Sequence, residues 1–515
     1  LEALAEMEKT AVLMKFELQC GNIDGFAELL NTHWELSKQL DKGSTNTCID
    51  QIFVSIEDLI DGRFISGAGG GVFLQVIMKK GVSYEKAQEF EKIDEDDENY
   101  PNVNGIWLEE DYVRTYPYNT LASDVIGFTV SGNVGSNGIE ASYNSILNGT
   151  DGREYGYLSE DSSYEKTVKE AQNGDTVVST IDLQVQSVVE KYITQFNEEN
   201  RSGTTLGSKN TAVMVMNPQN GEIYAMSSYP EYNLNNPRDL SAFYSPEKID
   251  KMSDKKKTEN LNKIWRNYCI SDAYEPGSTF KPMTVAACLD EGVTTGSHAY
   301  HCDGYQVING VRIKCVAYSR GGHGTINICQ SLMESCNDVL MQLGKRKFLQ
   351  YVNEFGFGKK TGIDLPGEAT GGVFTNDTMH AVELATSSFG QGQTVTMIQM
   401  AAAFSSVING GNYYEPHVVK EVKSENGAVL ESNDNALVRR VITENTSKKL
   451  RKYLYKTVEE GTALPAKVAG YQIGGKTGTA EKHPTGRGNY LVSFIGFATK
   501  DNPEVMIYVT IDEPH

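Results

Sequence analysis

Strand-like sequence on both sides of a helical stretch is the feature that most constrains the fold. Turn chemistry at Asn173-Gly174-Asp175 opens this pattern, and an apolar, helix-rich stretch at 280–408 lies in its middle. The β-rich runs fall at 176–181, 211–216, 222–226, 472–475, 490–498 and 505–511. Strands at both ends of a helical middle predict an α+β domain whose terminal strands share one sheet.

Two local patterns support this domain. The turn at 217–221 separates the runs 211–216 and 222–226, which predicts a hairpin. Asp182 can cap a helix that follows the first run. Apolar residues recur there at helical spacing: Val185, Val188, Val189, Tyr192 and Phe196.

The 515 residues exceed what one core organises, so we expect two domains, 1–172 and 173–515. The first contains a glycine-rich patch at 67–71 and an acidic stretch at 91–98. No Lys-Ser/Thr pair follows the glycines, which favours a flexible link over a phosphate loop.

Charge and apolar content exclude other classes. The formal net charge is −21, from 47 basic and 68 acidic residues, which argues against nucleic-acid binding. Eight cysteines are too sparse for a disulfide framework, although Cys302, Cys315, Cys329 and Cys336 are bunched. No run approaches the roughly 20 apolar residues of a membrane helix.

The most informative motif is Ser278-Thr279-Phe280-Lys281 after Pro276-Gly277. The turn delivers Ser278 to a helix start, and Lys281 lies one helical turn further on the same face. A desolvated lysine can take the proton of a serine nucleophile. The same spacing occurs at Ser83/Lys86, Ser163/Lys166, Ser245/Lys248 and Ser253/Lys256, so the pattern alone is weak.

Two further elements complete a set. Ser335-Cys336-Asn337 follows a helical segment at 328–334, and its serine and asparagine can both face a cleft. Lys476-Thr477-Gly478-Thr479 precedes a strand, where an edge could bind an extended peptide and Lys476 could attract a carboxylate. Lys360-Thr361-Gly362 repeats the triplet within a glycine-rich loop, where a loop role is favoured.

The order Ser278, Ser335, Lys476 is typical of penicillin-binding proteins and serine β-lactamases. Over roughly 100–515 the sequence resembles the class B, monofunctional transpeptidase branch of the former. Further matching segments are 114–117, 138–140, 151–152, 180–182, 217–226, 390–392 and 409–411. The resemblance implies a penicillin-binding, serine β-lactamase-like transpeptidase domain on an N-terminal mixed α/β pedestal of the dimerisation type.

The resemblance also implies a mechanism. Ser278 would attack a D-alanine carbonyl of a peptidoglycan stem peptide, with Lys281 as base and Ser335 shuttling the proton. Asn337 would hold the acyl side-chain amide, and Lys476 with Thr477, Gly478 and Thr479 would bind the substrate's terminal carboxylate. The backbone N–H groups of Ser278 and Thr479 would form the oxyanion hole.

The same resemblance implies acylation by β-lactams, no organic cofactor, and a membrane glycosyltransferase partner. It places the chain on the extracytoplasmic face of a bacterial membrane, anchored by an N-terminal helix not present here. The alternatives are a hydrolase, a β-lactam sensor and a non-catalytic cell-wall scaffold. A β-lactamase is disfavoured because the only Glu-x-Leu-Asn, at 259–262, precedes the nucleophile.

The bunched cysteines suggest a structural zinc site formed by Cys302, Cys315, His323 and Cys336. The run 305–313 alternates around Asn309-Gly310, which predicts a hairpin that brings Cys302 and Cys315 together across two strands. Some wall-elongation members of the family resemble this in having a metal site there. A Cys302–Cys315 disulfide and buried free thiols remain the alternatives.

Overall fold

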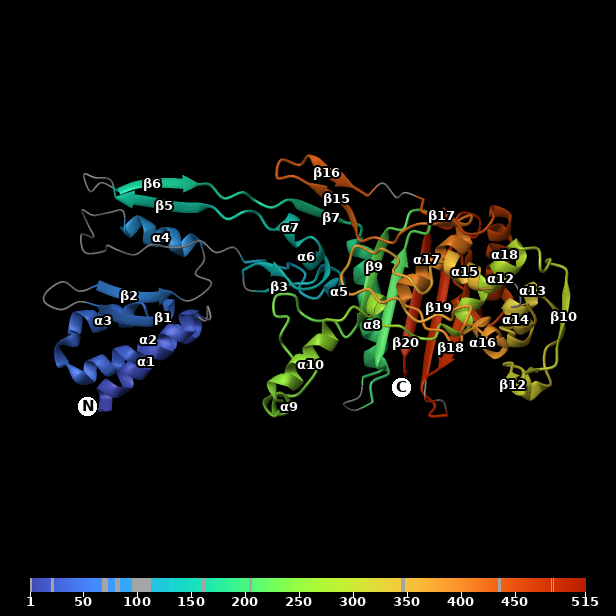
Figure 1. Ribbon diagram of the computed structural model, residues 1–515, viewed down its shortest axis with the longest axis horizontal. Coiled ribbons are helices and arrows are strands. Elements are labelled where there is room, and N and C mark those ends of the chain that lie inside the picture. The colour runs from blue at the N-terminus through green and yellow to red at the C-terminus, as the bar shows by residue number, and fades with distance from the viewer. Residues whose placement is uncertain are drawn as a thin grey trace. The chain divides into compact units, whose positions relative to one another are not determined.

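The computed structural model describes residues 2–19, 23–66, 73–78, 84–94, 113–130, 132–158, 164–202, 206–343, 348–433, 437–482, 484 and 486–515. The chain forms two compact units, 1–112 and 113–515 (Figure 1). The glycine-rich patch at 67–71 and the end of the acidic stretch at 91–98 lie outside the described residues. The predicted domain boundary near residue 173 remains a prediction.

The N-terminal unit packs helices against a two-stranded antiparallel sheet. Its core is aromatic: Trp34 and Phe53 are buried, with ring centroids 6.0 Å apart. Its elements are α1 Glu2–Gln19, α2 Ile23–Leu40, η1 Lys42–Ser44, α3 Thr47–Ser55, η2 Glu57–Leu59, β1 Ile60–Ser66, β2 Phe73–Met78 and α4 Tyr84–Asp94. Strand and helix together agree with the expected mixed α/β pedestal.

A five-stranded antiparallel sheet organises the second unit, in the order β18-β19-β20-β8-β9. Its strands are β8 Asn210–Met216, β9 Ile223–Tyr229, β18 Ile473–Glu481, β19 Tyr490–Ala498 and β20 Val505–Asp512. The β8–β9 hairpin and the meeting of N- and C-terminal strands in one sheet confirm both expectations. The pairing of β20 with β8 joins the C-terminal strands to the strands that precede the helical middle.

Helices cover both faces of this sheet, as its period-2 burial requires. Val213 and Val215 pack with α8 (Leu183–Glu199), whereas Met214 and Met216 face the larger core that contains α17 (Met397–Ile408). The other helices are α5 Ser123–Ile126, α6 Gly138–Ser142, α7 Asn144–Leu147, α9 Pro246–Asp250, α10 Asp254–Ile264, α11 Tyr268–Ser271, α12 Lys281–Asp290, α13 Ile328–Met333, α14 Asn337–Leu343, α15 Phe348–Glu354, α16 Ala381–Ser387 and α18 Glu444–Glu460.

Helix α8 confirms the predicted cap and part of the predicted apolar face, because Val189 is buried and Val185 packs against the same cluster. Asp182 accepts hydrogen bonds from the backbone N–H groups of Gln184 and Val185. Val188 and Tyr192 are exposed, at 53% and 61%. The buried side of the helix is partly polar: Gln186, Val189, Glu190, Ile193 and Asn197.

Short sheets and single turns complete the second unit. These strands are β3 Thr129–Val130, β4 Val134–Gly135, β5 Arg153–Leu158, β6 Tyr164–Lys169, β7 Thr176–Ser179, β10 Ala299–Cys302, β11 Tyr305–Ile308, β12 Val311–Lys314, β13 Gly324–Asn327, β14 Asn412–Tyr413, β15 Val419–Lys423, β16 Val429–Ser432 and β17 Arg439–Arg440. The short helical turns are η3 Gly277–Phe280, η4 Tyr318–Arg320 and η5 Leu464–Ala466. Within the described residues, no helix is long and apolar enough to span a bilayer.

Candidate active site

Ser278 lies in η3, immediately before α12. The turn depends on two glycines: Gly277 has a φ of 56° and donates its N–H to the carbonyl of Gly390 at 2.9 Å. A Cβ on Gly390 would lie 2.1 Å from the Gly277 carbonyl oxygen, so only glycine permits this approach. Pro282 falls in the first turn of α12, where its missing N–H breaks no helical hydrogen bond.

Lys281 is the first residue of α12 and is fully buried. Its Nζ donates to the Ser335 carbonyl at 2.6 Å, to Ser335 Oγ at 3.0 Å and to Asn337 Oδ1 at 2.7 Å. All three acceptors belong to the Ser335-Cys336-Asn337 element. The structure therefore brings the first two sequence motifs together around one amine.

Ser335 joins that amine to Ser278. Its backbone adopts a left-handed φ of 53° between α13 and α14, and its Oγ lies 3.0 Å from Ser278 Oγ. A continuous path of hydrogen bonds thus runs from Ser278 through Ser335 to Lys281. Asn337 is the first residue of α14.

Burial changes the protonation of Lys281. Desolvation lowers its pKa to about 7, although the thiol groups of Cys336 and Cys315 act in the opposite direction. A neutral amine can donate two hydrogen bonds and accept one. Lys281 can therefore accept a proton from a hydroxyl near neutral pH.

Strand β18 forms the other side of the turn that carries Ser278. A Cβ on Gly478 would lie 2.9 Å from Thr279 Cγ2 and 2.4 Å from Ser493 Oγ, which explains the glycine. Lys476 lies two residues before it, fully buried, and donates to the Thr477 carbonyl at 3.0 Å. Burial, and to a smaller extent the charge of Lys281, lowers the pKa of Lys476. Thr479, further along the same strand, is exposed.

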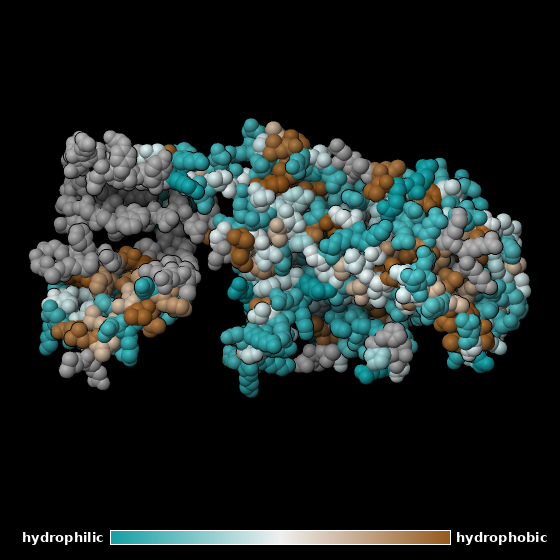
Figure 2. All heavy atoms as spheres, viewed as in Figure 1, coloured by the Kyte–Doolittle hydropathy of each residue, from teal (hydrophilic) through white to brown (hydrophobic). Residues whose placement is uncertain are grey.

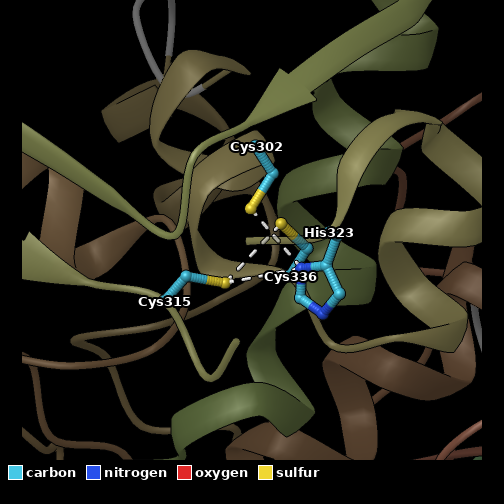
Figure 3. Close-up of side chains that lie close together, drawn as sticks. All are labelled: Cys302, Cys315, His323 and Cys336. Carbon is cyan, nitrogen blue, oxygen red and sulfur yellow. Dashed lines mark hydrogen bonds between the residues drawn. The ribbon is translucent and has the colours of Figure 1, made fainter. Parts of the chain in front are cut away.

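Four side chains gather behind the Ser335 element. Figure 3 shows the thiols of Cys302, Cys315 and Cys336 and Nδ1 of His323 pointing toward one another. The sulfur-to-Nδ1 distances are 3.4 Å from Cys302 and 3.7 Å from Cys315, and Cys315 and Cys336 Sγ are 3.7 Å apart. All four donor atoms lie within 4.8 Å of one another, and the three thiols are free.

This cluster fits a tetrahedral zinc ion. Zn–S bonds of about 2.3 Å and Zn–N bonds of about 2.0 Å place donor atoms about 3.5–3.8 Å apart, close to the observed separations. The hydrogen bond between the Cys315 and Cys336 sulfurs lowers the pKa of Cys315. Backbone N–H groups of Asn337 and Val339 also point at Cys315 and Cys336 sulfur.

The hairpin expected to bring Cys302 and Cys315 together is confirmed in part. Strands β11 and β12 pair around Asn309-Gly310, both with positive φ, as the sequence predicts. Cys302, however, belongs to β10, which pairs with β13 rather than with the hairpin. Cys315 reaches it because its N–H bonds to the Gly304 carbonyl at 2.7 Å.

Competing sequence matches lie elsewhere. Ser245 and Ser253 precede exposed helices α9 and α10, and Ser253 caps the latter through the N–H of Lys256. Ser83 and Ser163 lie outside the described residues. In Lys360-Thr361-Gly362, Thr361 bonds to the carboxylate of Glu368 within the loop, as a loop role requires.

The sequence predicts no role for Gly390, although the segment 390–392 is one of those that resemble the family. The only signal there was two glycines around a glutamine, which gives no hint of a contact with Gly277. Arg312 and Lys314 lie on the hairpin beside Asn337, and no sequence motif singles them out.

Comparison with known proteins gives consistent matches. A family model described as the penicillin-binding protein transpeptidase domain matches residues 211–515, and a penicillin-binding protein dimerisation domain model matches residues 8–179. Stage V sporulation protein D of Bacillus subtilis is 36% identical over 448 residues, 84% of this chain and 64% of that protein. The peptidoglycan D,D-transpeptidase MrdA of Acinetobacter baumannii is 26% identical over 456 residues, 79% of this chain and 64% of that protein.

Solved structures agree. Penicillin-binding protein 3 of Mycobacterium tuberculosis, complexed with ampicillin, aligns with a TM-score of 0.64 and 26% identity, covering 78% of this chain and 83% of that one. Penicillin-binding protein 2X of Streptococcus thermophilus gives a TM-score of 0.67 and 25% identity, covering 87% and 66%. The chain spans less than two thirds of the length of the two curated relatives named above.

Proposed function

The chain belongs to the class B penicillin-binding proteins, and we propose that it is a peptidoglycan D,D-transpeptidase that works through a serine acyl-enzyme and is acylated by β-lactams. The observation that carries the proposal is the hydrogen-bonded path from Ser278 through Ser335 to Lys281. It places a hydroxyl nucleophile next to a relay and a buried amine of lowered pKa.

In the first step, Ser278 Oγ attacks the penultimate D-alanine carbonyl of a stem peptide. Lys281 takes the hydroxyl proton, directly or through Ser335, and Ser335 returns a proton to the departing D-alanine amine. The C–N bond breaks and an ester on Ser278 forms. An amine from a second strand then displaces Ser278, which forms the cross-linking amide and restores the serine hydroxyl.

The remaining residues bind and orient the donor peptide. Asn337 holds the acyl side-chain amide, and Thr477, Gly478 and Thr479 on β18 pair with the peptide terminus. Lys476 supplies positive potential to its carboxylate from beneath the strand, because a bound anion favours the charged amine. The N–H groups of Ser278 and Thr479 stabilise the oxyanion.

A β-lactam sensor would share the acylation step but make no cross-links. We therefore expect cross-linked muropeptides when the protein acts with a polymerising glycosyltransferase on a lipid-linked substrate, and we expect penicillin to abolish them. Chromatography of the digested product gives the measurement. Acylation by penicillin without any cross-linked product would favour the sensor or scaffold.

The proposed reaction implies a cellular location. Peptidoglycan and β-lactams are met on the extracytoplasmic face of the cell membrane, where an N-terminal anchor would hold the protein beside its glycosyltransferase partner. No organic cofactor takes part in the proposed steps.

We further propose that Cys302, Cys315, His323 and Cys336 bind a structural Zn²⁺. Its role is to hold the Ser335 element against β10 and β12, because Cys336 lies between Ser335 and Asn337. Nδ1 is the ring atom of His323 that faces the cluster, 3.4 Å from Cys302 Sγ. Nε2 of the same ring is buried without a hydrogen-bond partner among the described residues. The ion does not touch the reacting atoms.

Removal of zinc should therefore lower thermal stability and β-lactam acylation together, and Cys336→Ser should do the same. Metal analysis should give one zinc per chain for the wild type. Cys329→Ser is the matched control, because Cys329 lies on α13 outside the cluster and contacts Met333. A wild-type protein free of zinc, with an acylation rate that chelators leave unchanged, would contradict the metal site.

A further inference from the structure

A group of basic residues lies on and near the β11–β12 hairpin, beside the active site. Residues 304–333 include Arg312, Lys314 and Arg320 but no aspartate or glutamate, in a chain whose net charge is −21. This stretch is therefore basic within an acidic protein. The proposed zinc site does not account for these basic residues, because the zinc ligands are three cysteines and a histidine.

The two faces of the hairpin have different surroundings. Gln306 and Ile313 are paired across the strands, and Gln306 donates to Asp338 Oδ1 at 2.6 Å while Ile313 packs on the core. The opposite face carries the pairs Tyr305 with Lys314 and Val307 with Arg312. Val307 is 57% exposed, so this face meets solvent.

Aromatic rings hold the cations of that face in place. The Arg312 guanidinium lies 4.9 Å from the Tyr305 ring centroid, and Lys314 Nζ lies 4.7 Å from that of Tyr318. The two tyrosine rings meet edge to face at 5.8 Å. We call Arg312, Tyr305, Tyr318 and Lys314 the cationic ladder.

The positive charges of the cationic ladder are not balanced by carboxylates of the described residues. Within the described part of the chain, neither Arg312 nor Lys314 forms an ion pair with a carboxylate. Asp338, beneath the hairpin, is buried and accepts hydrogen bonds from Gln306 and Gln342 instead. Cations ordered over rings and left without an anion form a surface that complements a negative ligand.

The hairpin also touches the catalytic elements. Asn337 Nδ2 donates to the Lys314 carbonyl at 3.4 Å, and Asn337 Oδ1 accepts from Lys281. The first of these hydrogen bonds joins the end of β12 to the start of α14, which Figure 1 shows at the same end of the second unit, and Figure 2 shows hydrophilic and hydrophobic residues mixed on the surface there. The ladder therefore adjoins the Ser335-Cys336-Asn337 side of the site.

We propose that the cationic ladder binds a carboxylate of the acceptor stem peptide. This inference rests on the proposed transpeptidase function. The donor carboxylate is already assigned to β18, through Lys476, Thr477 and Thr479, whereas the ladder adjoins Asn337. The acceptor is a second peptide that brings an amine together with its own carboxylates, and Arg312 can bind one of these in a bidentate manner.

The test separates acceptor use from acylation. The full chain is acylated with a synthetic thioester donor, and a free-carboxylate stem peptide or its amidated form serves as the acceptor amine. For R312Q/K314Q we expect the ratio of aminolysis to hydrolysis to fall about tenfold with the carboxylate acceptor and less than twofold with the amide. We expect R312K/K314R to retain most of the wild-type ratio.

Controls exclude indirect effects. K448Q/K449Q removes the same charge from exposed positions of α18 and should leave the ratio unchanged. Unfolding temperature and zinc content report whether R312Q/K314Q disturbs the adjacent Cys315. Equal ratios for the wild type and R312Q/K314Q, or equal losses with both acceptors, would overturn the proposal. Absence of any acylation in the wild type would instead count against the proposed function.

Discussion

Ser278→Ala is expected to abolish cross-linking and to remove all covalent labelling by penicillin. Alanine has no atom to form the ester. Among the described hydrogen bonds of Lys281, Ser335 is the only hydroxyl partner, and it is Ser335 that bonds to Ser278. In a serine hydrolase, loss of the nucleophile costs about 10⁶-fold in rate. Gel fluorescence with a labelled penicillin and chromatography of cross-linked product measure the two effects.

The matched control is Ser245→Ala. Ser245 and Lys248 have the same spacing as Ser278 and Lys281. Ser245 occupies the N-cap position of the exposed helix α9, but its side chain makes no capping hydrogen bond. We expect this variant to label and cross-link as the wild type does. Labelling that survives Ser278→Ala would mean that the nucleophile is a different residue.

Lys281→Ala is expected to slow acylation by about 10²- to 10⁴-fold, the usual contribution of a positioned base. The amine is the group to which the hydroxyl path from Ser278 leads, and burial lowers its pKa to about 7. The neutral form is the base, so the wild-type rate should rise with pH through about 7. Stopped-flow acylation across a pH series measures both.

Lys281→Arg provides the control for charge. Arginine keeps a cation in the cavity but does not deprotonate in this pH range, so it should remain as slow as alanine. Unfolding temperatures show whether either variant has lost its fold. Acylation by Lys281→Arg at a near-normal rate would reject Lys281 as the base.

Much of this architecture could be predicted from local sequence. The 217–221 turn, the Asn309-Gly310 hairpin and the Asp182 cap depend on contacts within a few residues, and all three occur as expected. The sheet that joins β8 to β20 followed from strands at both ends of the domain. The approach of Ser278, Lys281, Ser335 and Asn337 was expected from the motif order and the family resemblance, because S-x-x-K alone recurs in exposed segments.

Other features depend on tertiary contacts. In α8, Gln186 and Glu190 are buried where apolar spacing favoured Val188 and Tyr192, because Gln186 bonds to the Met226 backbone and Glu190 accepts the Ala122 N–H. The strand position of Cys302 was wrong in detail, since β10 pairs with the distant β13. Gly390 supports Gly277 from more than a hundred residues away, and no local pattern reports such a contact.

Intact-mass spectrometry of the wild-type protein after incubation with penicillin tests the central claim most directly. The account predicts a mass increase of one penicillin per chain, and peptide mapping should place it on Ser278, at the start of the hydrogen-bonded path that ends at Lys281. An unmodified mass at saturating penicillin, or an adduct on another residue, would contradict the serine acyl-enzyme.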